Sequence, residues 1–87
     1  MLKLLLLKNA YKLKINNIDK NLKIKDINRQ FNSCGCKIRK FKGKNGKSNG
    51  EGYLIFDDEA RAWNIMEELE MNNLGGKTEL IMKIEKI

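Results

Sequence analysis

The spacing of apolar residues changes along this chain, and these changes of period limit the folds that it can adopt. Apolar and polar side chains alternate in residues 11–16, which is typical of a strand with one buried face. Apolar residues then recur three and four positions apart at Ile24, Ile27 and Phe31, which is typical of a helix. Gly35 follows at a point where a glycine commonly ends a helix. The first part of the chain therefore predicts a strand followed by a helix.

The middle of the chain again contains strand-like segments followed by a segment with helical spacing of apolar residues. Residues 36–41 and 51–56 are strand candidates. The intervening residues 42–50 contain three Gly, three Lys and two Asn, which predicts a flexible loop. Asp57 and Asp58 then precede a helical pattern, where their charges suit a helix N-terminus. The apolar stripe of that second helix consists of Ala62, Ile65, Met66 and Leu69.

The end of the chain adds a last strand. A turn at residues 72–76 comes first, and the alternating apolar residues of the strand are Leu80, Met82 and Ile84. The order βαββαβ is that of the split βαβ or ferredoxin-like sandwich. We therefore expect an α+β fold in which two helices cover one face of a four-stranded antiparallel sheet. We assign residues 11–87 to this domain and residues 1–10 to an N-terminal extension.

The charge of the chain is distributed unevenly. Its net charge is +7. Residues 1–50 carry 14 Lys or Arg against 2 Asp or Glu, whereas residues 51–87 carry 4 against 9. A basic half facing a polyanion, with an acidic half turned away, suits a nucleic-acid-binding domain. The alternative is compositional, because an AT-rich genome favours Lys, and these lysines then simply cover solvated surfaces.

Several classes of function lack support in the sequence. The chain has no His, and Cys34 and Cys36 alone cannot complete a zinc site, so we expect reduced thiols and no metal or cofactor. We find no catalytic constellation and expect a binding protein rather than an enzyme. No apolar run approaches the roughly 20 residues that cross a bilayer. We expect no membrane contact and an intracellular location, with the nucleus favoured over the cytoplasm.

Two short segments resemble the RNP motifs of the RNA recognition motif (RRM) family. In residues 49–56, an RNP octamer is matched at Gly50, Gly52, Tyr53, Leu54 and Phe56. Residues 13–18 are similar to the companion hexamer, and Asn17, Phe31 and Gly35 stand at the spacing usual in the family. The resemblance extends over residues 11–87. Because both motifs are incomplete, the chain resembles a degenerate member of the family.

The resemblance implies an exposed sheet that binds single-stranded RNA. In this family bases stack on aromatic residues of the two central strands, and basic residues hold the phosphates. Lys14 and Glu51 occupy two of the three aromatic positions, which leaves Tyr53 for stacking. Lys14 and Glu51 either take part in binding or form a cross-strand ion pair with each other.

The predicted RNA-binding residues come from the sheet face, the second strand and the Lys-rich loop. They are Lys14, Asn16, Lys37, Arg39, Phe41, Lys42, Lys44, Lys47, Tyr53 and Ile55. We expect Lys37 and Arg39 to point to the sheet face or to solvent, and Ile55 to share the exposed face with Tyr53. Phe41 is either a displaced stacking residue or part of the core.

The main hypothesis is therefore a monomeric RRM-like module that binds single-stranded RNA with modest affinity, alone or beside other subunits of a ribonucleoprotein. The alternative is a protein-interaction module of a larger ribonucleoprotein with little RNA binding of its own. Trp63 on the second helix either covers the edge of the sandwich or anchors a protein partner, since Trp is enriched at interface hot spots. A structural domain without a ligand of its own is the third possibility.

Overall fold

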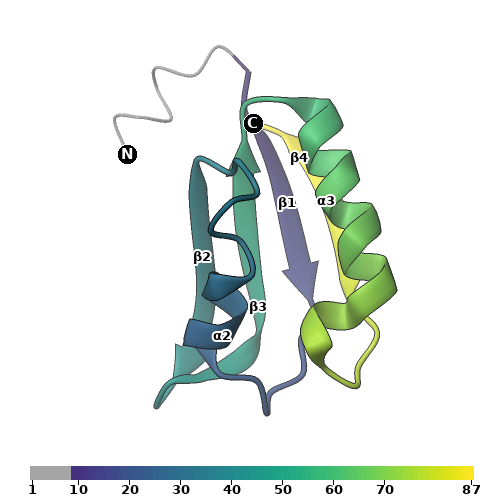
Figure 1. The fold of residues 1–87 in the computed structure, drawn as a ribbon. Helices are drawn as coiled ribbons and strands as arrows, with labels where there is room; N and C mark the ends of the chain where they lie inside the picture. The colour runs from purple at the N-terminus through teal and green to yellow at the C-terminus, as the bar shows by residue number, and fades with distance from the viewer. Residues whose placement is uncertain (1–8) are drawn as a thin grey trace.

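The computed structural model describes residues 9–87, which form a four-stranded antiparallel sheet with two helices on one face (Figure 1). The elements are β1 (Tyr11–Asn16), α2 (Ile24–Arg29), β2 (Ile38–Lys44), β3 (Lys47–Phe56), α3 (Glu59–Asn72), the 3₁₀ turn η1 (Asn73–Gly75) and β4 (Ile81–Lys86). The strand order is β2-β3-β1-β4, so β1 and β3 are central. The predicted βαββαβ sandwich is confirmed. Residues 1–8 of the predicted N-terminal extension lie outside the described residues.

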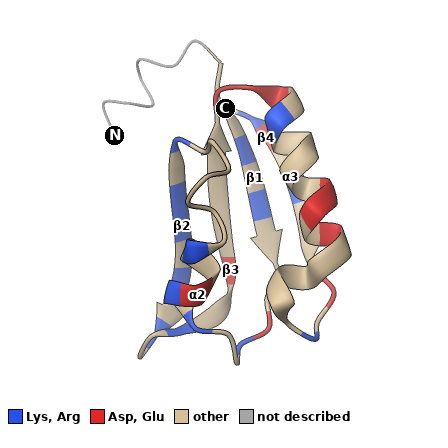
Figure 2. Ribbon diagram, viewed as in Figure 1, with Lys and Arg blue, Asp and Glu red and all other residues tan. Residues whose placement is uncertain are grey.

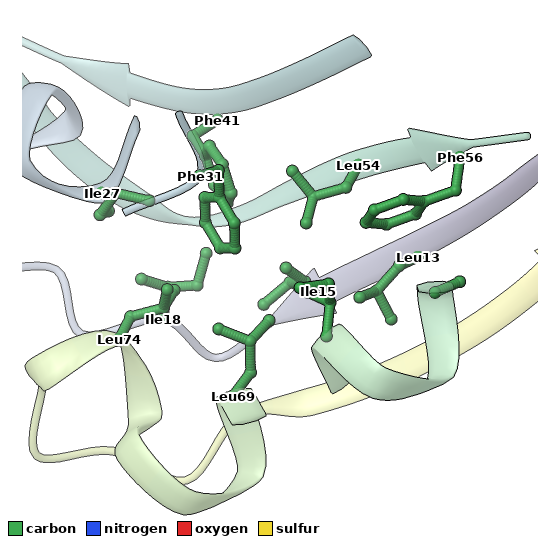
Figure 3. Close-up of a cluster of buried hydrophobic side chains, with 12 residues drawn as sticks. Leu13, Ile15, Ile18, Ile27, Phe31, Phe41, Leu54, Phe56, Leu69 and Leu74 are labelled. Atoms are coloured by element: carbon green, nitrogen blue, oxygen red, sulfur yellow. The ribbon is translucent and has the colours of Figure 1, made fainter. Parts of the chain in front are cut away.

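The hydrophobic core lies between the sheet and the two helices (Figure 3). From the central strands it receives fully buried residues, Leu13 and Ile15 of β1 and Leu54 and Phe56 of β3. From the helical side it receives Ile27, Phe31, Ala62, Ile65 and Leu69. Leu13, Ile15 and the five residues of the helical side are ones that the two-residue and three-to-four-residue periods assign to buried faces. Removing their apolar surface from water is the main force that holds helices and sheet together.

The N-terminus of α3 and the loop before α2 are each held by a carboxylate. The Asp58 side chain accepts a hydrogen bond from the Ala60 N–H (2.9 Å), which confirms the predicted helix cap. The Asp19 side chain accepts hydrogen bonds from the N–H groups of Asn21 (2.9 Å) and Lys77 (3.0 Å). These two bonds hold the pKa of Asp19 below its ordinary value and join the β1–α2 loop to the segment before β4.

The prediction of a flexible loop over residues 42–50 is wrong. Strand β2 continues to Lys44 and β3 begins at Lys47, so that only Asn45 and Gly46 form the turn. Both turn residues have positive φ angles, 55° and 80°, which a type I′ hairpin turn requires. The Asn-Gly pair is itself the strongest short signal for such a hairpin, and it explains why the loop is replaced by paired strands.

The end of the β2–β3 hairpin is fixed against the segment before α2. The Ile24 N–H donates a hydrogen bond to the Gly46 carbonyl (2.9 Å), and the Ser48 N–H donates one to the Leu22 carbonyl (2.9 Å). A Cβ at Gly43 would lie 2.1 Å from Cδ1 of Ile24, so the two segments approach closely there. These contacts fix the backbone of the hairpin that carries Lys44 and Lys47.

A bulge interrupts the pairing of β2 with β3. Phe41 lies opposite Gly52, whereas Gly43 lies opposite Ser48, so residues 49–51 of β3 face Lys42 alone. Gly50 within the bulge has a φ of 102°, and its N–H donates a hydrogen bond to Ser48 Oγ (3.0 Å). The bulge changes which side chains of the two strands meet.

Candidate functional site

The candidate site is the face of the sheet opposite the helices, here called the open face. Tyr53 of β3 lies directly opposite Lys40 of β2 on one side and Lys14 of β1 on the other. Lys14 in turn lies opposite Lys83 of β4. Directly opposed residues on one sheet face have Cβ atoms about 4.5–5.5 Å apart, so these four side chains form a continuous row. The row places one aromatic ring among three cations.

Lys12 adds a fourth cation beside this row. Its Nζ atom lies 4.4 Å from the centroid of the Tyr53 ring, a cation–π contact. Lys12 and Lys14 share the open face because alternate residues of β1 point to the same side. Figure 2 shows basic residues along β1 and β2 and acidic residues along α3. The basic and acidic halves of the sequence therefore also lie on different elements of the fold.

The two carboxylates nearest to this row have local partners. Glu51 Oε1 lies 3.0 Å from Lys42 Nζ, and Glu85 Oε1 lies 3.4 Å from Lys14 Nζ. The predicted Lys14–Glu51 pair is wrong, because the β1–β3 register places Lys14 opposite Tyr53 and Glu51 opposite Asn16. Both observed pairs are about half exposed, so each contributes little to stability. In each pair the two charges offset each other, so an anion meets less negative charge from Glu51 and Glu85 and less positive charge from Lys14 and Lys42.

These side chains surround a shallow depression of about 130 Å³. Its lining consists of Lys12, Lys14, Asn16, Lys42, Glu51, Gly52 and Tyr53. Three lysines, a tyrosine and an amide are the donors and the stacking surface that a nucleotide contacts.

No helix within residues 9–87 is long and apolar enough to cross a membrane.

Solved structures share this arrangement of sheet and helices. The first two RRM domains of yeast poly(U)-binding protein Pub1 align with a TM-score of 0.58 and 18% identity, over 88% of this chain and 47% of that one. The second RRM domain of the same protein aligns with a TM-score of 0.58 and 15% identity, over 88% and 93%. The chain has the RNA recognition motif fold. It spans about half the length of the two-domain structure. No protein-family model and no curated protein sequence matches the chain.

The RRM fold explains where the two RNP-like segments lie. Residues 13–18 include most of β1, and residues 49–56 include most of β3, so both belong to the central strands. Of the predicted site residues, Lys14, Asn16, Lys42 and Tyr53 meet around the shallow depression. The RRM fold therefore brings together four of the residues that the resemblance selects.

Three other predicted site residues do not lie exposed on the open face of this RRM-fold domain. Phe41 is buried and stacks on Phe31 with ring centroids 5.5 Å apart, so it belongs to the core. Arg39 lies opposite Leu54, which places it on the helix side of the edge strand β2. Ile55 shares the open face with Tyr53, as predicted, but its side chain is only 2% exposed. As a residue of a central strand, it has neighbours on both sides, Ile38 and Lys12.

The remaining predicted lysines lie at the two ends of the RRM-fold sheet. Lys37 precedes β2, and its Nζ atom lies 3.4 Å from Asp57 Oδ2. Lys44 and Lys47 lie opposite each other at the far end of the hairpin. Near them is a pocket of about 340 Å³ lined by Lys23, Ile24, Lys25, Asn45, Gly46 and Lys47. Lys47 thus forms a basic cluster with Lys23 and Lys25.

Sequence reasoning did not select four residues that the RRM fold places on the open face: Lys12, Lys40, Ile81 and Lys83. Lys12 and Lys83 could have been selected, because each alternates with apolar residues of its strand. Lys40 could not, because its face depends on the register of β2 with β3. Ile81 is 64% exposed and lies beside Asn16, so the open face also carries an apolar side chain.

Proposed function

We propose that this domain binds single-stranded RNA on the open face with modest affinity. The observation that carries the proposal is the row Lys40, Tyr53, Lys14 and Lys83, with Lys12 beside the tyrosine ring. Tyr53 stacks on one base, and the lysines around it contact the phosphates on either side. The role is one of binding, without catalysis.

The charges of the open face support this proposal. Within residues 9–87, Lys12, Lys40 and Lys83 form no ion pair, so their ammonium groups are available to phosphates. Lysines that neutralise phosphates release counterions, which makes RNA binding strongly dependent on salt. Phosphate contacts carry no base sequence, so the domain discriminates weakly between sequences.

The single aromatic ring limits the affinity. Stacking of one base on an aromatic side chain contributes roughly 1–3 kcal/mol. A base that stacks on Tyr53 displaces the Lys12 ammonium group from the ring, and that lysine then moves toward a neighbouring phosphate. We therefore propose a short binding site of few nucleotides that acts together with other domains or subunits of a ribonucleoprotein.

The fold likeness supports the choice of ligand without deciding it, because one fold hosts many functions. The two solved neighbours come from a protein named for binding poly(U). A short oligo(U) is for this reason the first RNA to test, with a random-sequence RNA of equal length beside it.

The test is an NMR titration of the isotope-labelled chain with both RNAs at low and high salt. We expect shifts at Lys12, Lys14, Lys40, Tyr53 and Lys83 that become smaller when the salt concentration rises. Arg39 is the internal control, since it neighbours Lys40 on β2 but lies on the other face of the sheet. Absence of shifts at low salt and millimolar RNA would overturn the proposal.

A further inference from the structure

A groove lies on the helix side of the sheet, between α3 and the edge strand β4. Its volume is about 330 Å³, and its lining consists of Met66, Glu70, Glu79, Leu80 and Met82. Met66, Leu80 and Met82 pack against the rim of the core and are only partly buried. Met82 lies opposite Ile15, whose side chain points into the core, so the groove and the open face are on opposite sides of the sheet.

Trp63 lies on the same line of α3 as two residues of the groove lining, Met66 and Glu70. Glu59, Trp63, Met66 and Glu70 follow one another at intervals of four, three and four residues, so they form one line along the helix. Trp63 is 48% exposed, although a tryptophan has the largest apolar surface of any side chain. The surface therefore combines an exposed aromatic residue with an adjacent groove that three apolar residues and two glutamates line.

The charge of this surface is negative. Glu59 and Glu70 lie on this line of α3 and Glu79 lines the groove, in a chain whose net charge is +7. Glu70 and Glu79 are exposed on the two sides of the groove, and neither forms an ion pair within residues 9–87. A polyanion such as RNA is repelled here, whereas a cationic segment gains Coulomb energy from both carboxylates.

We infer that this α3–β4 groove binds a basic segment of a partner protein, in which one apolar side chain is flanked by Lys or Arg. The apolar side chain enters the groove between Met66 and Met82, whose flexible thioether side chains adapt to its shape. The flanking cations pair with Glu70 and Glu79, and Trp63 covers the segment as an anchor. The groove volume is at the lower end of the roughly 300–1,000 Å³ usual for ligand pockets, which suits a single inserted side chain.

This inference does not depend on the proposed RNA binding. The groove and the open face lie on opposite sides of the sheet, so an RNA and a protein segment can be bound at the same time. If RNA does not bind to the open face, the inference about the groove still stands, and the reverse is also true.

The test begins with a random-sequence peptide library selected on the whole chain and counter-selected on Trp63→Ala. We expect enrichment of peptides with an apolar residue flanked by Lys or Arg. Trp63 is the only tryptophan, so its fluorescence reports directly on the site, and binding of an enriched peptide shifts its emission to shorter wavelength. No enrichment, or enrichment of acidic peptides, would overturn the inference.

Matched charge changes locate the binding surface. Glu70→Lys should weaken binding of an enriched basic peptide at least about five-fold, since it replaces an attraction by a repulsion. Glu68→Lys makes the same change of charge elsewhere on α3, away from the groove lining, and should have little effect. Equal losses from both variants, or peptide-induced NMR shifts at Tyr53 in place of Met66 and Met82, would contradict the assigned groove. Trp63 emission that changes with protein concentration alone would show a second copy of the chain as the occupant, and would overturn the choice of partner.

Discussion

The Nζ atom of Lys12 lies 4.4 Å from the centroid of the Tyr53 ring on the open face of the sheet. The contact joins neighbouring central strands, since Lys12 belongs to β1 and Tyr53 to β3. It brings a cation next to the one aromatic ring that the RNP-like segments provide for stacking. In the proposed RNA complex, the ring contacts a base and the ammonium group contacts a phosphate.

Removing the ring of Tyr53 should weaken RNA binding. For Tyr53→Leu we expect the Kd for oligo(U) to rise between about 5-fold and 150-fold, because one stacked base contributes roughly 1–3 kcal/mol. Tyr53→Phe keeps the ring and should retain most of the affinity. Fluorescence anisotropy at a fixed salt concentration measures both Kd values, and circular dichroism verifies the fold. An unchanged Kd in Tyr53→Leu would rule out stacking at this position.

Lysines of the open face should determine the salt dependence. Lys83→Gln should reduce the slope of log Kd against log salt concentration by about 0.7, the value for one phosphate contact with a single strand. Lys86→Gln is the matched control on the same strand, because Lys86 lies opposite Tyr11 on the helix side of the sheet. The measurement is a series of RNA titrations at increasing salt. Equal slopes for the two variants would contradict the assignment of phosphates to the open face.

Two glycines of the hairpin should differ in their effect on stability. A Cβ at Gly46 has nothing within 4 Å, but its φ of 80° is unfavourable for alanine, so Gly46→Ala should cost about 1–2 kcal/mol. At Gly43 a Cβ would lie 2.1 Å from both Ile24 Cδ1 and the Lys47 carbonyl oxygen. Gly43→Ala should therefore cost more than Gly46→Ala, because backbone and packing must both shift. Urea denaturation of the two variants measures the difference, and a larger loss for Gly46→Ala would contradict the packing described.

Asp19 should make stability depend on pH in the acid range. Hydrogen bonds from the N–H groups of Asn21 and Lys77 lower the pKa of its carboxyl below the ordinary value of 3.8. The unfolded chain therefore binds a proton at this site before the folded chain does. The contribution to stability is fully present above pH 3.8 and is lost as the pH falls through the lowered pKa.

Asp19→Asn should lower stability at neutral pH and remove this part of the pH dependence. The test is the midpoint of urea denaturation, measured at a series of pH values from neutral to about pH 2. Native carboxylates become protonated toward the acid end of this range. Asp26→Asn is the control, since Asp26 forms only a surface pair with Arg29 at 3.4 Å. A pH profile unchanged by Asp19→Asn would show that the two hydrogen bonds have no role in acid stability.

The thiol of Cys36 should react slowly with alkylating reagents. Burial and the neighbouring Cys34 thiol raise its pKa from 9.0 to about 11. The thiolate is the reactive form, so Cys36 should be alkylated by iodoacetamide about 100-fold more slowly than a thiol of ordinary pKa at mildly alkaline pH. Mass spectrometry of alkylated peptides measures the rate, and rapid modification at Cys36 would contradict the raised pKa of this partly buried thiol.

The order of elements and the buried faces of β1 and α3 could be read from the sequence alone. The alternation of residues 11–16, the stripe of Ala62, Ile65 and Leu69, and the cap at Asp58 depend on neighbours within one or two turns. Local patterns of this kind hold whichever distant segments pack against them. The Asn-Gly signal at residues 45–46 was equally local, and it outweighs the loop-like composition around it.

The composition of the candidate site was decided by the tertiary structure. Which of Arg39 and Lys40 shares a face with Tyr53, and whether Phe41 is buried, depends on the register of β2 with β3. Because side chains alternate along a strand, a shift of one residue exchanges the two faces. Likewise, Lys14 meets Glu85 and Glu51 meets Lys42 through pairings with other strands and through the bulge at Gly50. The sequence determined which residues could be buried or exposed, and long-range strand pairing decided which exposed residues meet.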